Sequence, residues 1–101
     1  MKEIKMLAGH IREEMNDAET YAKLALRYKD DDRSLSQTFE KLAEQELDHA
    51  DMLHAQASRL IKERKENGET PPVAMSAVWS WEHENMMDCV ARVKVLLAEL
   101  R

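Results

Sequence analysis

Apolar residues recur at alternating steps of three and four along three long stretches of the chain, at about residues 4–29, 34–66 and 73–100. This spacing places them on one face of an α-helix. Polar segments at 30–34 and 67–72 separate the stretches. The pattern therefore predicts three helices. Sustained three-four spacing is typical of helices that pack at shallow angles in bundles, so we expect the first two to form an antiparallel hairpin.

Residues suited to helix ends lie at the expected boundaries. Ser34, or an Asp of the preceding turn, can cap the second helix. Gly68 suits the position just past the end of that helix, where a left-handed backbone is common. Thr70 can cap the third helix, with Pro71 at its first position. We expect residues 1–101 to form a single all-α domain.

Three polar residues interrupt the apolar faces of the first two helices: Glu14, Glu46 and His49. Burying an unpaired carboxylate costs several kcal/mol, so such groups are kept when they are paired or bound to metal. In an antiparallel hairpin, residues equidistant from the turn face each other. The midpoint of Glu14 and Glu46 is residue 30, and that of Glu14 and His49 lies between residues 31 and 32. Both midpoints fall in the Asp-rich turn, so the three side chains are expected to converge at one level.

Two other interpretations of these positions stay open. A shift of the first apolar face by one residue would turn Met15 inward in place of Glu14. His49 could be a core histidine bonded to a backbone carbonyl. The spacing of Glu46 and His49 favours a ligand pair, because residues three apart lie on the same face of a helix.

Two carboxylates and one imidazole suit iron or manganese, and less exclusively zinc. Carboxylate-bridged di-iron sites in four-helix bundles use four Glu and two His, with Glu-x-x-His on two of the helices. One hairpin of this chain supplies half of that set. We therefore expect a homodimer that completes a four-helix bundle and holds two ions at its interface, with higher oligomers left open.

Other ionisable residues are given less specific roles. Asp51 and His54 have similar spacing to the Glu–His pair, but they fall on the outer side of the second helix and are expected to be solvated. Glu82 could be an extra ligand, an ion-pair member or a solvated group. His83 is expected at the surface. Cys89 is expected to be a small buried residue.

Composition narrows the classes of function. The chain has 101 residues, a net charge of −5 and one Cys. The charge disfavours nucleic acid as a partner, and a single Cys excludes an internal disulfide and a Cys-based zinc cage. No apolar run approaches the roughly 20 residues that cross a membrane. The first residues do not have the pattern of a signal peptide, so we expect a cytoplasmic protein or one inside a cytoplasmic protein compartment.

Two segments resemble a known superfamily. Glu14 is followed seven residues later by Tyr21, and the stretch from Glu46 to Ala50 has the form Glu-x-x-His-Ala. Both are similar to motifs of the ferritin-like superfamily, with the rubrerythrin and encapsulated-ferritin branches closest. The resemblance covers about residues 3–65.

The resemblance implies a function and roles for individual residues. Glu14, Glu46 and His49 would bind iron, and Tyr21 would hydrogen-bond beside the site. The family's chemistry implies a ferroxidase-type oxidoreductase, which oxidises Fe(II) to Fe(III) at a di-iron centre with dioxygen or peroxide. These four residues form the expected catalytic set.

The chain also departs from these relatives. A rubredoxin-type domain needs four Cys, and only Cys89 is present. Encapsulated ferritins usually end in a flexible targeting tail, whereas the third helix is expected to run almost to Arg101. Packaging in an encapsulin-type shell therefore stays open, with no targeting tail seen. Two alternatives are a non-catalytic metal-binding protein and a metal-free helical adaptor whose polar residues set the register of a dimer.

Overall fold

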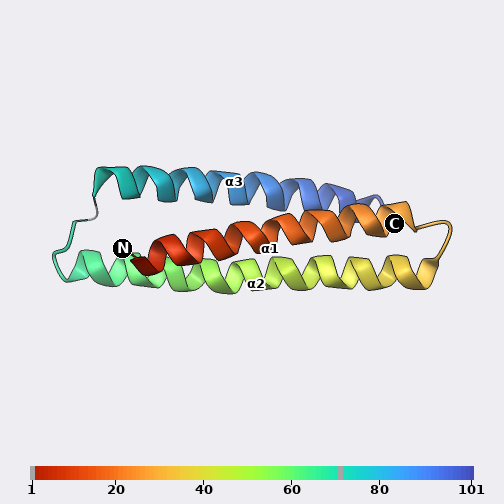
Figure 1. Ribbon diagram of the computed structural model, residues 1–101, viewed down its shortest axis with the longest axis horizontal. Helices are drawn as coiled ribbons and strands as arrows, with labels where there is room; N and C mark the ends of the chain where they lie inside the picture. The colour runs from red at the N-terminus through yellow and green to blue at the C-terminus, as the bar shows by residue number, and fades with distance from the viewer. Residues whose placement is uncertain (1, 71) are drawn as a thin grey trace.

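The chain folds into three long helices joined by two short connections (Figure 1). A computed structural model describes residues 2–70 and 72–101, and only the backbone of Ala74. The helices are α1 (Lys2–Arg27), α2 (Arg33–Glu66) and α3 (Val73–Ala98). The prediction of an all-α hairpin followed by a third helix is confirmed. Among the residues described, no helix has an apolar stretch long enough to cross a bilayer.

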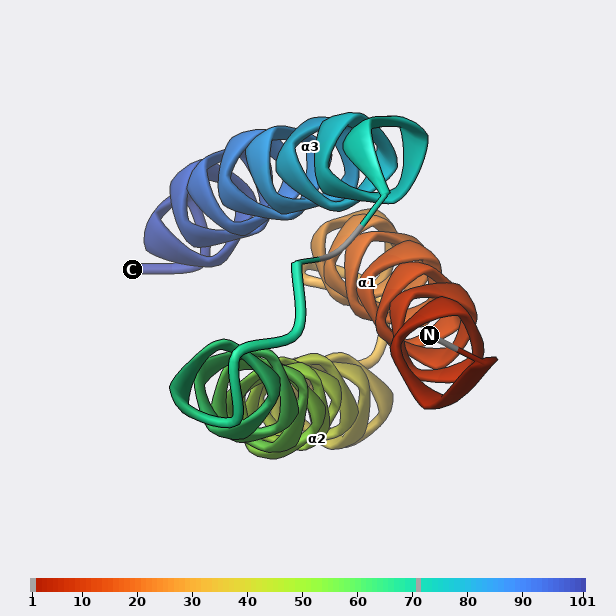
Figure 2. The same ribbon diagram turned by 90° about the vertical axis from the view of Figure 1, so that its left-hand side faces the viewer.

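The helices do not share their contacts equally. Viewed along the long axis, α1 and α2 form the hairpin and α3 lies against α1 (Figure 2). Contacts between α3 and α2 are few. The molecule is elongated, with principal extents of 56 × 18 × 17 Å. Consequently α1 is the central helix, and it must present apolar residues in two directions.

Small residues make the close contact of α2 with α1. Fully or almost fully buried positions recur on α2 at intervals of seven: Ser36, Ala43, Ala50 and Ala57. Four leucines from the apolar face expected for α2 are only half-buried, and they lie one or three positions from members of this line: Leu35, Leu42, Leu53 and Leu60. Small side chains let two helix backbones approach closely, so the larger ones are displaced to the flank. The small residues, and not the leucines, therefore form the centre of the contact between α1 and α2.

A similar offset occurs on α1. Met15 is buried, with 3 % of its surface exposed, and joins the cluster that includes Ile11, Cys89 and Val93. The interpretation that turned Met15 inward thus describes the contact with α3. Glu14 occupies the neighbouring flank of the same helix and is partly buried. Because α1 packs on two helices, Met15 contacts α3 while Glu14 is directed toward α2.

The ends of α2 follow specific capping rules. Of the two candidates for its N-cap, the Asp is the one used, since Asp32 accepts a hydrogen bond from the Leu35 N–H at 3.1 Å. At the other end Gly68 has a φ of +79°. The Gly68 N–H donates to the Lys65 carbonyl, and the Glu69 N–H donates to the Arg64 carbonyl. This pair of bonds is the Schellman motif, so the role predicted for Gly68 is confirmed.

The start of α3 differs from the expectation. Its N-cap is Pro72, and no side chain caps the helix there. The prediction that Thr70 caps α3 is therefore wrong, because the helix begins two residues further along than that cap requires. Pro71, predicted at the first helical position, lies outside the described residues.

Removing the Asp32 cap should destabilise the protein measurably. We expect Asp32→Ala to lower the free energy of unfolding by about 1 kcal/mol, because the Leu35 N–H loses its partner. Urea denaturation followed by circular dichroism measures the change. Asp31→Ala, at an exposed neighbouring position, is the matched control. Equal losses in the two variants would contradict the capping role.

Candidate metal centre

Glu14 from α1 meets Glu46 and His49 from α2 near the middle of the hairpin. The Nδ1 atom of His49 lies 3.4 Å from Oε2 of Glu14 and 3.7 Å from Oε2 of Glu46. One possible ligand atom from each residue lies within 4.8 Å of the others. The three residues converge as the equal distances from the turn predicted. Below, we call Glu14, Glu46 and His49 the triad.

Glu46 is the most enclosed member of the triad. Its side chain is 16 % exposed, against 27 % for Glu14 and 53 % for His49. The Oε2 atom of Glu46 is buried and has no hydrogen-bond partner within the described residues. A buried carboxylate oxygen without a partner is costly, and a bound cation would offset that cost. The donor set, two carboxylates and one imidazole, fits iron or manganese.

On α1, the triad lies on the flank turned away from α3. Two ion pairs mark the side that faces α3: Arg12 with Glu82 at 3.3 Å, and Glu19 with Arg92 at 3.2 Å. At 3.6 residues per turn, Glu14 lies about 160° and 140° around the helix from those two α1 residues. Its carboxylate is therefore directed away from the α1–α3 contact.

On α2, the triad residues likewise lie on the side turned away from α3. His54 faces α3, since its Nε2 atom lies 3.0 Å from Nδ1 of His83. His49 is five residues earlier, which places it about 140° around the helix. The triad thus opens on the face of the hairpin that α3 does not cover. We call this the uncovered face; the half-buried residues Leu42 and Leu53 lie on it, about one turn to either side of the triad.

Tyr21 packs near this site. Its ring stacks on Phe39, with centroids 6.0 Å apart, and Tyr28 stacks on the same ring at 6.2 Å. No hydrogen bond joins Tyr21 to the triad in the part of the chain that the structure describes. The structure therefore gives Tyr21 a packing role, and its predicted hydrogen bond beside the metal stays a prediction.

The structure also places four other ionisable residues, and two of the roles expected for them need correction. Asp51 is exposed, as expected. His54, however, is not solvated: it bonds to His83 and stacks on Trp79 at a centroid distance of 5.6 Å. For the same reason His83 is not a free surface residue. Glu82 is only 11 % exposed and pairs with Arg12, so it is an ion-pair member within the chain.

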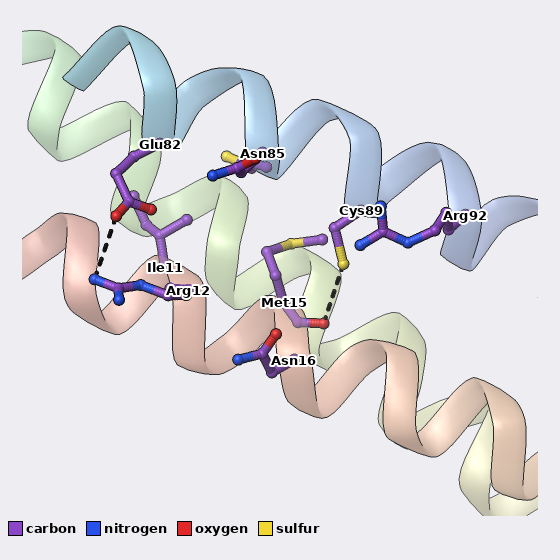
Figure 3. A pocket seen from close by; sticks show the side chains of 9 residues that line it. Ile11, Arg12, Met15, Asn16, Glu82, Asn85, Cys89 and Arg92 are labelled. Atoms are coloured by element: carbon purple, nitrogen blue, oxygen red, sulfur yellow. Dashed lines mark hydrogen bonds and ion pairs between the residues drawn. The ribbon is translucent and has the colours of Figure 1, made fainter. Parts of the chain in front are cut away.

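A hollow of about 220 Å³ lies between α1 and α3 (Figure 3). Cys89 lines it, is buried as predicted, and lies 3.4 Å from the Met15 carbonyl oxygen. Burial, together with the nearby Glu19 carboxylate, raises the pKa of the Cys89 thiol. Because the thiolate is the nucleophile and metal ligand, this protonated thiol is unsuited to either role.

Glu19 on α1 forms an ion pair with Arg92 on α3. Burial opposes its ionisation, but hydrogen bonds from Arg92, Cys89 and Lys23 outweigh that effect and lower the pKa of Glu19. Arg92 donates to the carboxylate at 3.2 Å, and Cys89 lies 3.5 Å from it. The hollow is therefore bordered by compensated charges, whereas the triad retains an unpartnered carboxylate oxygen.

A helical hairpin with a Glu on one helix and Glu-x-x-His on the next corresponds to half of a carboxylate metal site in a ferritin-like bundle. Comparison with protein families agrees with this class. The rubrerythrin family model matches residues 5–94, so the chain belongs to the rubrerythrin family of the ferritin-like di-iron superfamily. Members of this family typically bind iron. The match extends past the hairpin into α3. No curated protein and no solved structure gave a significant match.

Proposed function

We propose that this protein binds iron at a di-iron site shared across a homodimer and oxidises Fe(II) to Fe(III) with dioxygen or peroxide. One observation carries the proposal. A buried carboxylate oxygen of Glu46, for which the described residues offer no hydrogen-bond partner, lies beside His49 and Glu14 on a face that α3 leaves uncovered. Membership of the rubrerythrin family supports iron as the metal.

The need for a second copy follows from the number of ligands. One chain offers three ligand residues, too few for a six-coordinate ion, and the triad opens on the uncovered face. Two hairpins related by a two-fold axis would supply four Glu and two His, the set used in ferritin-like di-iron proteins. The half-buried residues Leu42 and Leu53 of α2 lie on the same face. Pairing two such faces would bury these leucines while it completes the site.

Each member of the triad has a distinct part in the proposed site. Glu14 and Glu46 supply negative charge that compensates the cation, and this compensation matters more as the ion charge rises from 2+ to 3+. His49 supplies a neutral nitrogen, and its 53 % exposure leaves that side of the site open to ions from solvent. When bound, the iron pair supplies one electron per ion to the oxidant. Manganese or zinc would use the same donors.

Rapid oxidation of added Fe(II) tests the proposal. Anaerobic protein loaded with Fe(II) should develop near-ultraviolet ferric absorbance on exposure to oxygen or peroxide faster than buffer does. Glu46→Gln should reduce the rate to the buffer background, because the buried ligand oxygen loses its charge. Glu44→Gln, at an exposed position on α2, is the matched control and should keep the rate of the unmodified protein.

The outcomes separate the two metal-binding hypotheses. Iron binding without accelerated oxidation would reject the enzyme and leave a non-catalytic metal-binding protein. Equal rates in Glu46→Gln and Glu44→Gln would reject the triad as the site of oxidation.

A further inference from the structure

A second group of possible metal ligands lies between α2 and α3, away from the triad. The Nε2 atom of His54 and the Nδ1 atom of His83 are 3.0 Å apart, and the ring centroids are 4.9 Å apart. Both residues are partly buried. His54 and His83 are 29 positions apart in the sequence, so their approach is a product of tertiary packing.

The separation of the two nitrogens suits coordination of one ion. Two nitrogens that bind Zn²⁺ at about 2.0–2.1 Å lie roughly 2.8–3.4 Å apart when the angle at the metal is about 90–110°. The observed 3.0 Å lies within this range. A hydrogen bond between the two neutral rings uses one N–H proton. A change of tautomer that places this proton on the other nitrogen of the same ring leaves both facing lone pairs available to the ion, and both rings stay neutral.

We propose that His54 and His83 form a second metal site, which binds an imidazole-preferring divalent ion such as Zn²⁺ and links α2 to α3. Two imidazoles favour Zn²⁺, Cu²⁺ or Ni²⁺, whereas the carboxylate-rich triad favours iron or manganese. The remaining coordination positions would be filled by water or by a small anion. This site needs no second copy of the chain, and it does not depend on the function proposed for the triad.

The surroundings of the pair favour a fixed, neutral imidazole at His54. Its ring stacks on Trp79 with an interplanar angle of 21°, which restrains its orientation. Partial burial and the neighbouring His83 lower the pKa of His54, while the negative charge of Asp51 acts in the opposite direction. The neutral form is the one that binds metal. Asp51 also supplies negative charge one helical turn before His54.

The position of the pair gives the site a structural consequence. α3 contacts α2 at few places, and the His54–His83 bond is one of them. An ion held by both rings would therefore fasten α3 to the hairpin where its other contacts are sparse. Binding to the folded chain should raise the temperature of unfolding.

Zn²⁺ titration of a triad-disabled protein tests this proposal. In full-length protein carrying Glu46→Gln and His49→Gln, competition with a chromophoric chelator should still show one Zn²⁺ per chain. Adding His54→Gln or His83→Gln should weaken that binding at least about tenfold, because loss of a ligand should cost no less than loss of an outer-sphere partner. Glutamine can still hydrogen-bond across the contact, and circular dichroism confirms that each variant is folded.

A matched control uses another histidine. His10 is exposed on α1 and lies 3.6 Å from Glu13, so His10→Gln removes an imidazole without touching the α2–α3 contact. That variant should keep both the Zn²⁺ affinity and the Zn²⁺-induced rise in unfolding temperature. The proposal is overturned if the triad-disabled protein binds no Zn²⁺, or if His54→Gln and His83→Gln bind as tightly as His10→Gln. In the unmodified protein, Zn²⁺ binding at this pair without accelerated oxidation of Fe(II) would reject only the function proposed for the triad.

Discussion

Protein in which Glu14 and His49 are both replaced by alanine should contain almost no iron after purification from iron-supplied cells. The substitutions remove one ligand from each helix of the hairpin and leave the unpartnered oxygen of Glu46 without its neighbours. Three ligands per chain would become one, too few to hold an ion against water. Elemental analysis of unmodified and substituted protein, purified without chelators, measures the loss.

A matched pair of substitutions controls for a general loss of acidic and imidazole groups. His10 and Glu13 form an exposed His–Glu pair on α1, 3.6 Å apart. The double variant His10→Ala and Glu13→Ala should keep the iron content of the unmodified protein. If the Glu14 and His49 variant retains as much iron as this control, the triad is not the metal site. A helical adaptor, whose polar residues only set the register of a dimer, would then be the better account.

Ala50→Asp should unfold the protein or come close to it. Ala50 is fully buried, at 0 % exposure, in the line of small residues where α2 contacts α1. A carboxylate there would be both too large for the contact and unpaired, and burying it costs several kcal/mol. Domains of this size are stable by only about 5–15 kcal/mol. Thermal unfolding followed by circular dichroism should show a large fall in the midpoint or no cooperative transition.

Ala55→Asp provides the comparison for that substitution. Ala55 lies on the same helix but is exposed, so the same chemical change meets solvent there. We expect a change within about 0.5 kcal/mol, as is usual for surface positions. Similar destabilisation of the two variants would show that the line of small residues is not the centre of the hairpin contact.

The helices and the convergence of the triad could be predicted from the sequence because both depend on local or one-dimensional rules. Helical periodicity, together with the polar segments at 30–34 and 67–72, predicts the three helices. In an antiparallel hairpin, the distance of a residue from the turn then fixes its level along the partner helix. Glu14 and His49 consequently lie together, with their atoms 3.4 Å apart.

The line of closest contact was harder to predict, because apolar size and contact distance favour different residues. By size and hydrophobicity, Leu42 is the residue of α2 expected to contact α1. In the structure, its small neighbour Ala43 is fully buried against α1 and Leu42 is only half-buried. The offset is one position. It leaves Leu42 and the triad on the uncovered face, where we propose that a second copy binds.

The α2–α3 contact could not be predicted from periodicity. His54 falls on the outer side of α2 when only the hairpin is considered, and His83 lies on a helix whose direction of approach is set by tertiary packing. The structure brings them to within 3.0 Å. Glu82 on α3 similarly pairs with Arg12 on α1, which is distant in the sequence. Such pairs depend on how α3 lies on α1, which no spacing rule in the sequence specifies.

Native mass spectrometry of the intact protein, after anaerobic addition of Fe(II), tests the shared site most directly. It counts chains and metal ions in the same particle. If two chains share the site, we expect a dimer that carries two iron ions, and a dimer without iron when Glu46 is changed to glutamine. A monomer that holds iron as tightly as any dimer, or a dimer that takes up none, would contradict it.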